Sequence, residues 1–278
     1  MEQLFLKASL ISSRAFTNTY STSFSLGIKA LDKSIHEAIY AIYGFVRVAD
    51  EIVDTFHDQN KEKLIHEFQN DTFKAINDGF STNAILHSFQ WAVNHYGIDH
   101  NHITAFFDSM IMDLHKTSYN REEYEKYIYG SAEVVGLMCL KVFCHPNDEQ
   151  YKALIPPARK LGSAFQKINF LRDLKADYFD KGRMYFPNLS IEEFNATTKK
   201  TIEAELEDEF AEAFKGIKKL PSNCKFGVYT AYTYYLELFK KIRKKDAELI
   251  KNERVRIPDR MKNWLLLRSI LRYKLGLI

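Results

Sequence analysis

Two short segments of the sequence repeat acidic and amide side chains at helical spacing. In YGFVRVADEIVD, Asp50 and Asp54 stand four residues apart, and Arg47 and Tyr43 continue the same row toward the N-terminus. In QKINFLRDLKAD, the polar residues are spaced three, four and four apart and comprise Gln166, Asn169, Asp173 and Asp177. Residues three or four apart are neighbours on a helix surface, about 5–6 Å apart at Cβ. Each segment therefore predicts a helix face that carries clustered oxygen ligands.

Two such faces, opposed, would suit a divalent metal that holds a diphosphate. Mg²⁺ prefers hard oxygen ligands and usually keeps waters and substrate phosphates, so one or two carboxylates from each helix are enough. Arg47 and Arg172 stand beside the acidic residues and would bind phosphate oxygens, for which a planar guanidinium is well shaped. The predicted metal ligands are Asp50, Asp54, Asn169, Asp173 and Asp177.

A solvated, salt-bridged helix face is the simpler interpretation of either row taken alone, because charge pairs at this spacing are common on surfaces. The neighbouring residues favour a functional site instead. Asp50 lies within the apolar run FVRVADEIV, and Asp173 lies within INFLRDL. Carboxylates in such surroundings are rarely tolerated unless they are paired or bind a metal. Two independent rows make a metal–diphosphate site the better prediction.

The composition indicates which elements carry these rows. The chain has 278 residues with 11 Gly and 6 Pro, fewer than is usual, which leaves few turn residues and favours long helices. In Ile103–Leu114, apolar residues recur at helical spacing. No linker divides the chain, so we predict a single all-α domain over 1–278, a helical bundle around a central apolar cavity. Further helices are predicted over 2–18, 34–57, 60–78, 83–96, 121–143, 148–178, 200–218, 222–251 and 259–275.

Charge, cysteine spacing and missing motifs exclude several classes of function. The net charge of +3 is too small for a nucleic-acid partner. The three cysteines form no metal-binding spacing, and their odd number fits a reducing compartment, so a cytoplasmic location is expected. The sequence has neither the Glu-x-x-His of di-iron bundles nor a GxGxxG dinucleotide motif. No uninterrupted apolar run approaches about 18 residues, so we expect no membrane crossing.

The C-terminal segment PDRMKNWLLLRSILRYKLGLI mixes leucines and Trp264 with basic residues. A basic amphipathic helix can lie on an anionic membrane surface, which would make the protein peripheral at the inner membrane face. A final helix packed on the body with a solvated basic face explains the pattern equally well. No feature of the sequence predicts an oligomeric state.

Four segments together resemble the squalene/phytoene synthase family. They are YSTSFS, YAIYGFVRVADEIVD, YIYGSAEVVG and GSAFQKINFLRDLKADYFDKGRMYFP, within 20–187. The last is the most specific, because it combines the second aspartate row with an RxYFP loop. The resemblance covers nearly the whole chain, is to the bacterial phytoene synthase type, and implies the all-α isoprenoid synthase fold.

The resemblance implies a head-to-head condensation of two prenyl diphosphates with Mg²⁺ as cofactor and Mn²⁺ as an alternative. One allylic diphosphate ionises, and a second molecule captures the cation to give a cyclopropylcarbinyl diphosphate. That intermediate ionises again and rearranges. The expected substrate is geranylgeranyl diphosphate, giving phytoene through prephytoene diphosphate for carotenoid synthesis. The alternatives are squalene or dehydrosqualene from two farnesyl diphosphates, squalene requiring a hydride from NADPH, and a non-catalytic binding or assembly protein.

The resemblance also assigns roles to individual residues. The five oxygen ligands named above would hold the metal ions, and the remaining implied positions contact diphosphate or line the reaction centre. The residues expected to contact diphosphate are Ser21, Arg47, Arg172 and Arg254. Those expected to line the reaction centre are Tyr43, Tyr127, Gln166 and Tyr235, and Tyr235 is also expected to contact diphosphate.

A carbocation needs walls that stabilise it and exclude water, and aromatic faces do both. Phe24, Phe45 and Phe165, together with the site tyrosines, are predicted to line the cavity. Gly136 lies in an apolar helical run, where it either leaves room for a prenyl tail or allows close helix packing. Arg183, in the loop that contains RMYFP, is a further predicted phosphate contact.

Overall fold

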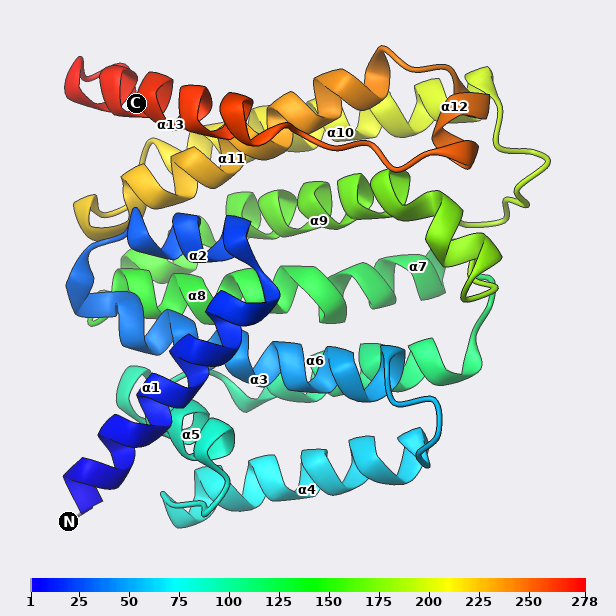
Figure 1. The fold of residues 1–278 in the computed structure, drawn as a ribbon. Coiled ribbons are helices and arrows are strands. Elements are labelled where there is room, and N and C mark those ends of the chain that lie inside the picture. Colours follow the sequence, from blue (N-terminus) through cyan, green and yellow to red (C-terminus); the bar gives the residue numbers. More distant parts are fainter. Residues whose placement is uncertain (1) are drawn as a thin grey trace.

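The computed structural model describes residues 2–278, and its regular elements are helices (Figure 1). It is 78% helical, and no strand occurs in that range. One isolated β-bridge pairs Ser118 with Met184. The all-α prediction is confirmed.

Most helices follow one another with short connections, and the longest connection, residues 180–195, joins α9 to α10. A 3₁₀ turn, Lys33–Ile35, precedes α3, and a π-helical turn, Tyr129–Glu133, joins α7 to α8. The helices are α1 Glu2–Tyr20, α2 Thr22–Lys29, α3 His36–Asp54, α4 Lys61–Asp78, α5 Ala84–Tyr96, α6 His100–His115, α7 Arg121–Ile128, α8 Val134–Cys144, α9 Asp148–Phe179, α10 Ala196–Ile217, α11 Ser222–Arg243, α12 Ala247–Asn252 and α13 Asp259–Lys274.

Short polar side chains begin many of these helices, and glycines end two of them. Asn60 and Asn147, for example, accept hydrogen bonds from backbone N–H groups in the first turns of α4 and α9. Gly79 and Gly97 terminate α4 and α5 at φ 66°, a left-handed conformation that glycine adopts without strain.

The structure departs most from the predicted helices in two places. Residues 22–29, which no predicted helix covered, form α2, because Ser21 accepts a hydrogen bond from the backbone N–H of Phe24 and caps a new N-terminus. The predicted helix 222–251 is divided into α11 and α12. Apolar spacing did not reveal this division, since Ile242 and Ala247 are buried on either side of it.

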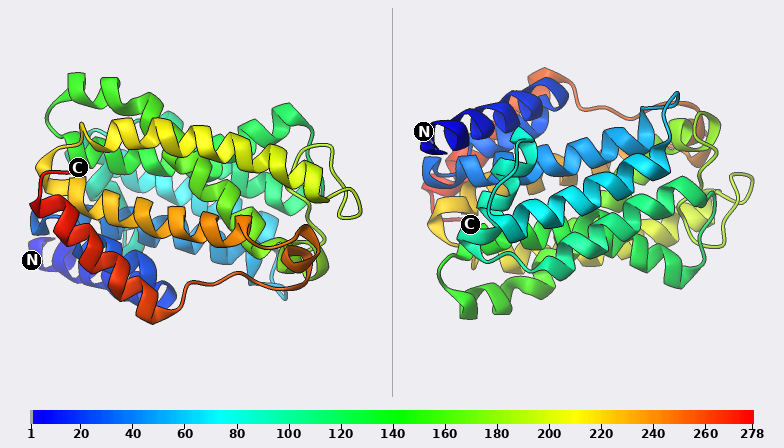
Figure 2. Two further views of the ribbon diagram at one scale, coloured as in Figure 1. Left: turned by 90° about the horizontal axis from the view of Figure 1, so that it is seen from above. Right: turned by 90° about the horizontal axis from the view of Figure 1, so that it is seen from below.

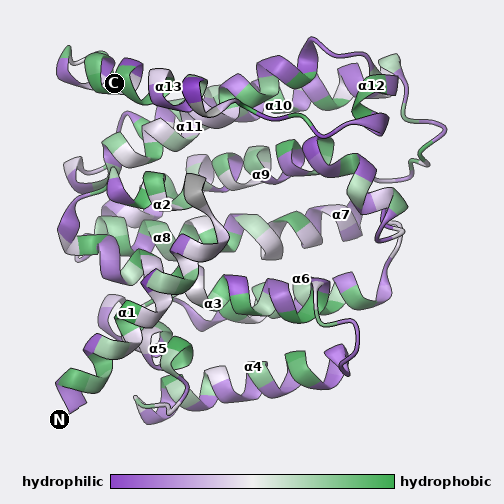
Figure 3. Cartoon of the chain, in the orientation of Figure 1, coloured by the Kyte–Doolittle hydropathy of each residue, from purple (hydrophilic) through white to green (hydrophobic). Residues whose placement is uncertain are grey.

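The helices stack in layers, with α8 in the middle of the molecule (Figures 1 and 2). It packs against α3, α6 and α9, while α9 also packs against α10. The last helix, α13, packs on α11 at one edge. Most helices alternate apolar and polar residues, as amphipathic helices with one inward face should (Figure 3).

Glycine permits two close approaches at the centre. A Cβ on Gly130, in the π-helical turn, would lie 2.1 Å from the backbone oxygen of Ala105 on α6. A Cβ on Gly162, in α9, would lie 2.9 Å from Cα of Glu133. These contacts bring α6 and α9 tightly against the turn between α7 and α8.

The continuous helical stretch Arg121–Cys144 bears on the expectation that the chain crosses no membrane. Its 24 residues are long and apolar enough to cross a membrane by length and composition. Polar residues interrupt its apolar run, so the run falls short of 18 residues. Half of its most apolar window is buried inside the protein, as in the core helix of a globular fold, so this one helix is weak support for a membrane span.

Candidate active site

The first aspartate row runs along one face of α3. Tyr43, Arg47, Asp50 and Asp54 are all partly accessible, whereas the opposite face of the helix is buried in the core. Arg47 lies 4.0 Å from Asp50, measured from Nη1 to Oδ2, and also pairs with Glu51. Its guanidinium carbon lies 4.7 Å from the ring centroid of Tyr20.

Asp50 is accessible and yet strongly desolvated. About a third of its side chain is exposed (35%). Burial nevertheless raises the pKa of Asp50 to about 7; Arg47 opposes the rise, and the carboxylates of Asp54 and Asp113 add to it. A carboxyl on a convex, salt-bridged surface would not be desolvated in this way, so Asp50 lies in a recess.

The second row runs along α9, and arginines neutralise its central member. Asp173 lies 2.5 Å from Nη2 of Arg172 and 2.6 Å from Nε of Arg254, which precedes α13. Asn169 donates to Gln166 at 3.3 Å and accepts from the hydroxyl of Tyr235 at 3.3 Å. The structure thus brings residues from α11 and from the chain after α12 to the α9 row.

Lys181 connects the two rows. Its Nζ lies 2.8 Å from Oδ2 of Asp54 on α3 and 3.5 Å from Oδ1 of Asp177 on α9. Burial raises the pKa of Asp177 to about 6, with Lys181 opposing and Asp173 and Asp54 adding to the rise. Burial would also raise the pKa of Asp54, but Lys181 and Arg183 together hold it below its usual value. The two predicted rows therefore face one another across a single site.

A buried cluster around Asp113 holds Arg183 in place. Arg183 lies 2.9 Å from Asp54 and donates at 2.7 Å to the backbone oxygen of Asp113. The carboxylate of Asp113 accepts hydrogen bonds from three tyrosine hydroxyls, and burial raises its pKa. The three tyrosines are Tyr119 at 3.3 Å, Tyr127 at 2.7 Å and Tyr185 at 3.0 Å.

Sequence reasoning missed Asp113, Lys181, Tyr119 and Tyr185. Asp113 carried a usable signal, because it is a carboxylate within the apolar helix Ile103–Leu114, as Asp50 is within its own apolar run. The other three stand near the second row or in connecting segments without any repeated spacing. Only their contacts in the folded chain reveal them.

An accessible apolar stripe on α8 adjoins the rows. Val135, Gly136 and Cys139 are partly accessible although α8 lies between α3, α6 and α9. Burial raises the pKa of Cys139 to about 12, so protein atoms surround this thiol. Gln166 of the α9 row donates to Ser131 at 3.3 Å, just before α8.

Gly136 and Phe165, two residues predicted to line the cavity, are both partly accessible. The nearest atom to a Cβ on Gly136 would be the backbone oxygen of Ala158, at an ordinary 3.7 Å. A side chain at Gly136 would therefore meet only an ordinary van der Waals contact, and the tight packing that was the alternative occurs at Gly130 and Gly162. Phe165 stacks on Tyr235 with ring centroids 3.9 Å apart.

Two predicted wall residues are buried. Phe45 is fully buried and stacks on Phe89 at 3.9 Å, on the side of α3 away from Tyr43. Two residues along a helix turn the side chain to the opposite face, so the prediction for Phe45 is wrong. Tyr127 is buried (3% exposed) and donates to Asp113, so it belongs to the cluster that holds Arg183, and its place at the reaction centre stays a prediction.

Phe24 and Ser21 lie toward the outside of the site. Phe24 is half exposed, and its ring centroid is 5.0 Å from that of Tyr43. Burial raises the pKa of Tyr43, and a hydrogen bond with Ser21 opposes the rise. These contacts join the start of α2 to the first turn of the α3 row.

The donor set fits a cation that keeps part of its own hydration shell. Among residues 2–278, no group of three or more His, Cys, Asp or Glu side chains is arranged to hold a metal by itself. Each row instead offers two carboxylates, and the raised pKa values of Asp50 and Asp177 mark carboxylates whose charge is poorly compensated. Such oxygens suit Mg²⁺, which binds one or two carboxylates together with waters and phosphates.

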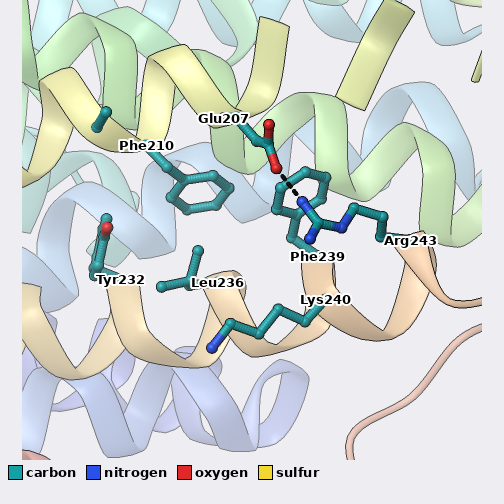
Figure 4. A pocket seen from close by; sticks show the side chains of 8 residues that line it. Glu207, Phe210, Tyr232, Leu236, Phe239, Lys240 and Arg243 are labelled. Atoms are coloured by element: carbon teal, nitrogen blue, oxygen red, sulfur yellow. Dashed lines mark hydrogen bonds and ion pairs between the residues drawn. The ribbon is translucent and has the colours of Figure 1, made fainter. Parts of the chain in front are cut away.

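Two hollows of about 290 Å³ lie away from the aspartate rows. One, between α10 and α11, has an apolar floor that includes Phe210 and Leu236, with the Glu207–Arg243 ion pair at its rim (Figure 4). The other lies between the end of α2, the start of α11 and α13. Neither contains a residue of the site.

Two facing aspartate rows within an all-helical bundle define the isoprenoid synthase class. The family model described as squalene/phytoene synthase matches residues 17–261, so the chain belongs to that family. Over 212 residues it is 29% identical to 4,4'-diapophytoene synthase of Staphylococcus haemolyticus, covering 73% of this chain and 71% of that protein. It is 24% identical to phytoene synthase of Arthrospira platensis, covering 88% and 87%.

A solved structure shows the same fold. The crystal structure of a dehydrosqualene synthase in complex with ligand matches with a TM-score of 0.82 at 22% identity, covering 97% of this chain and 98% of that one. The chain is therefore a prenyltransferase of the head-to-head prenyl synthase family.

Proposed function

We propose that this enzyme condenses two geranylgeranyl diphosphates head to head, giving phytoene through prephytoene diphosphate. The observation that carries the proposal is the meeting of Asp54 and Asp177 at Lys181, next to the accessible apolar stripe of α8. The charged groups where the rows meet would serve the diphosphates, and the apolar stripe would serve the prenyl tails.

The polar end of the site would bind and activate the leaving diphosphate. The aspartates of both rows, with Asn169, would hold Mg²⁺ or Mn²⁺, which when bound neutralises charge on the departing group. Arg47, Arg172 and Arg254 stand beside these carboxylates, where their guanidinium groups can contact diphosphate oxygens. Lys181 and Arg183 add positive charge at the meeting of the rows.

The apolar part of the site would protect the carbocation. Tyr43, Phe165 and Tyr235 offer aromatic faces, whose negative π-surfaces attract positive charge. The stacked pair Phe165–Tyr235 belongs to α9 and α11 and is fixed next to Asn169 by the Tyr235 hydroxyl. No side chain needs to act as a nucleophile, because the second substrate's double bond captures the cation.

Two observations bear on the length of the prenyl tail. The absence of tight packing at Gly136 and the similarity to a protein named phytoene synthase support geranylgeranyl diphosphate. The similarity to 4,4'-diapophytoene synthase and to a dehydrosqualene synthase supports a pair of farnesyl diphosphates as the alternative.

The deciding experiment supplies purified enzyme and Mg²⁺ with either geranylgeranyl or farnesyl diphosphate, with and without NADPH, and identifies the hydrocarbon by mass spectrometry. Phytoene from the longer substrate at the higher kcat/KM supports the proposal. Dehydrosqualene or squalene formed preferentially from farnesyl diphosphate would replace it with the alternative. No hydrocarbon from either substrate would contradict both.

A further inference from the structure

The outward face of α13 carries a continuous row of exposed apolar side chains. Its four members are spaced three, four and four residues apart, so they lie on one face of the helix. More than half of each side chain is exposed: Trp264 53%, Leu267 60%, Leu271 63% and Leu275 71%. Because α13 lies at the edge of the molecule (Figure 1), these exposed side chains form an unpartnered apolar surface.

The opposite face of α13 already has a partner. Leu265 and Ser269 are buried, and the helix packs on α11. The exposed row is therefore not the core-facing side of α13, because that side is the one packed on α11. It is a second apolar face on a helix whose position α11 already fixes.

Basic residues accompany the exposed row, and acidic ones do not. Arg260, Arg268 and Lys274 are exposed, and 260–278 contain no Asp or Glu. The guanidinium carbon of Arg268 lies 5.5 Å from the ring centroid of Trp264, which ties a cation to the apolar row. Such a face complements a surface that is apolar beneath and negatively charged at its rim.

We propose that this face of α13 docks on an anionic lipid bilayer. The 16-residue helix would lie in the plane of the headgroups along about 24 Å. Trp264 and the leucines enter the acyl boundary, while Arg260, Arg268 and Lys274 contact lipid phosphates. A second copy of the chain fits this surface less well, because a two-fold contact between two α13 helices would bring their positive charges close together.

Docking at α13 would also orient the active site. Residues 253–258 connect α12 to α13, with Val255 and Ile257 buried and Arg254 bonded to Asp173. The α9 row is thus joined to α13 by a short anchored segment. This consequence depends on the proposed function, whereas the docking surface does not.

Sedimentation with vesicles tests the proposal on the full-length protein without substrate. The wild type should bind vesicles of phosphatidylcholine and phosphatidylglycerol in equal parts, and bind phosphatidylcholine alone far less. Leu267→Gln/Leu271→Gln should lower the partition coefficient at least about tenfold. Arg268→Gln/Lys274→Gln should lower it about fivefold for each charge removed.

Matched controls separate docking from general surface effects. Lys63→Gln/Lys126→Gln removes two exposed charges far from α13, and Leu249→Gln removes an exposed leucine on α12. These variants should bind vesicles as the wild type does. All variants should keep the wild-type melting temperature and their turnover of detergent-solubilised substrate.

Failure of the wild type to bind anionic vesicles would overturn the proposal, as would equal losses in the α13 and control variants. A wild-type dimer that Leu267→Gln/Leu271→Gln converts to monomer would assign the face to a second copy. Loss of turnover by the wild type in detergent would count against the proposed function and leave the docking result unaffected.

Discussion

The rows on α3 and α9 share the DxxxD spacing, but they differ in how their charge is compensated. On α9, two guanidinium groups contact Asp173 within 2.6 Å. On α3, Arg47 lies 4.0 Å from Asp50, and the pKa of Asp50 rises to about 7. The comparison teaches that one sequence pattern can give a neutralised carboxylate and a poorly compensated one. A bound cation would gain most at Asp50, and next at Asp177 of α9, whose pKa rises to about 6, since these two carboxylates have the least compensated charge.

The largest expected effect is on turnover after a change in the α3 row. Asp50→Ala should lower kcat by about 10³-fold, because the leaving diphosphate loses electrostatic stabilisation. Steady-state kinetics at saturating Mg²⁺ measure the effect, with circular dichroism as the control for folding. A variant with native turnover would show that Asp50 holds no metal and that the difference in charge compensation between the two rows does not affect catalysis.

The arginines test whether the rows differ in function as they do in charge. Arg47→Gln should cost about 10²-fold in kcat/KM, whereas Arg254→Gln should cost about 10-fold, because Arg172 still pairs with Asp173. Both constants come from the same assay as a function of substrate concentration. Equal losses in the two variants would contradict the idea that the α9 row has a spare cation.

The Asp113 cluster supports the α3 row through Arg183, so disturbing it should weaken both stability and activity. Asp113→Asn should lower the free energy of unfolding by about 3 kcal/mol, because the buried carboxylate accepts three tyrosine hydroxyls and faces a guanidinium. Tyr119→Phe, which removes one of these hydrogen bonds, should cost only about 1 kcal/mol. Urea unfolding measures both; equal values would show that the cluster is not cooperative.

The smallest effect is a difference in stability that depends on pH. The pKa of Asp50 rises from 3.8 to about 7 on folding, so the native state binds the proton more tightly than the unfolded state. The stability that this proton contributes is present at low pH and is lost as the pH rises from 3.8 to about 7. In metal-free buffer, Asp50→Asn should therefore be more stable than the wild type above pH 7 and equal to it near pH 4. The gain should be about 1 kcal/mol, reduced by solvent screening of a side chain that is 35% exposed.

Asp173→Asn provides the matched comparison for that measurement. It removes a carboxylate that two arginines neutralise, so it should lose about 1–2 kcal/mol where Asp50→Asn gains. Urea unfolding in the presence of a chelator measures the free energy of unfolding of both variants against the wild type. The same sign for both variants would mean that the rows do not differ in charge compensation.

Local periodicity made most of the helices predictable. Amphipathic spacing gave helices such as α4, Lys61–Asp78, and α5, Ala84–Tyr96, nearly to their ends, because one face of each packs inward along its length. It failed at α2, where a single capping hydroxyl starts a new helix, and between α11 and α12, where buried residues continue across the division. A cap or a turn changes the chain direction without changing the apolar pattern.

The sequence alone determined the two aspartate rows, since a helix places residues three and four apart on one face wherever it lies in the fold. It also determined the basic, apolar character of the last helix. Only the tertiary structure decided that Lys181 joins the rows, that Asp113 holds Arg183, that Phe45 faces the core and that Gly136 is not tightly packed. These facts depend on contacts between residues far apart in the chain, and local spacing contains no information about which distant groups will meet.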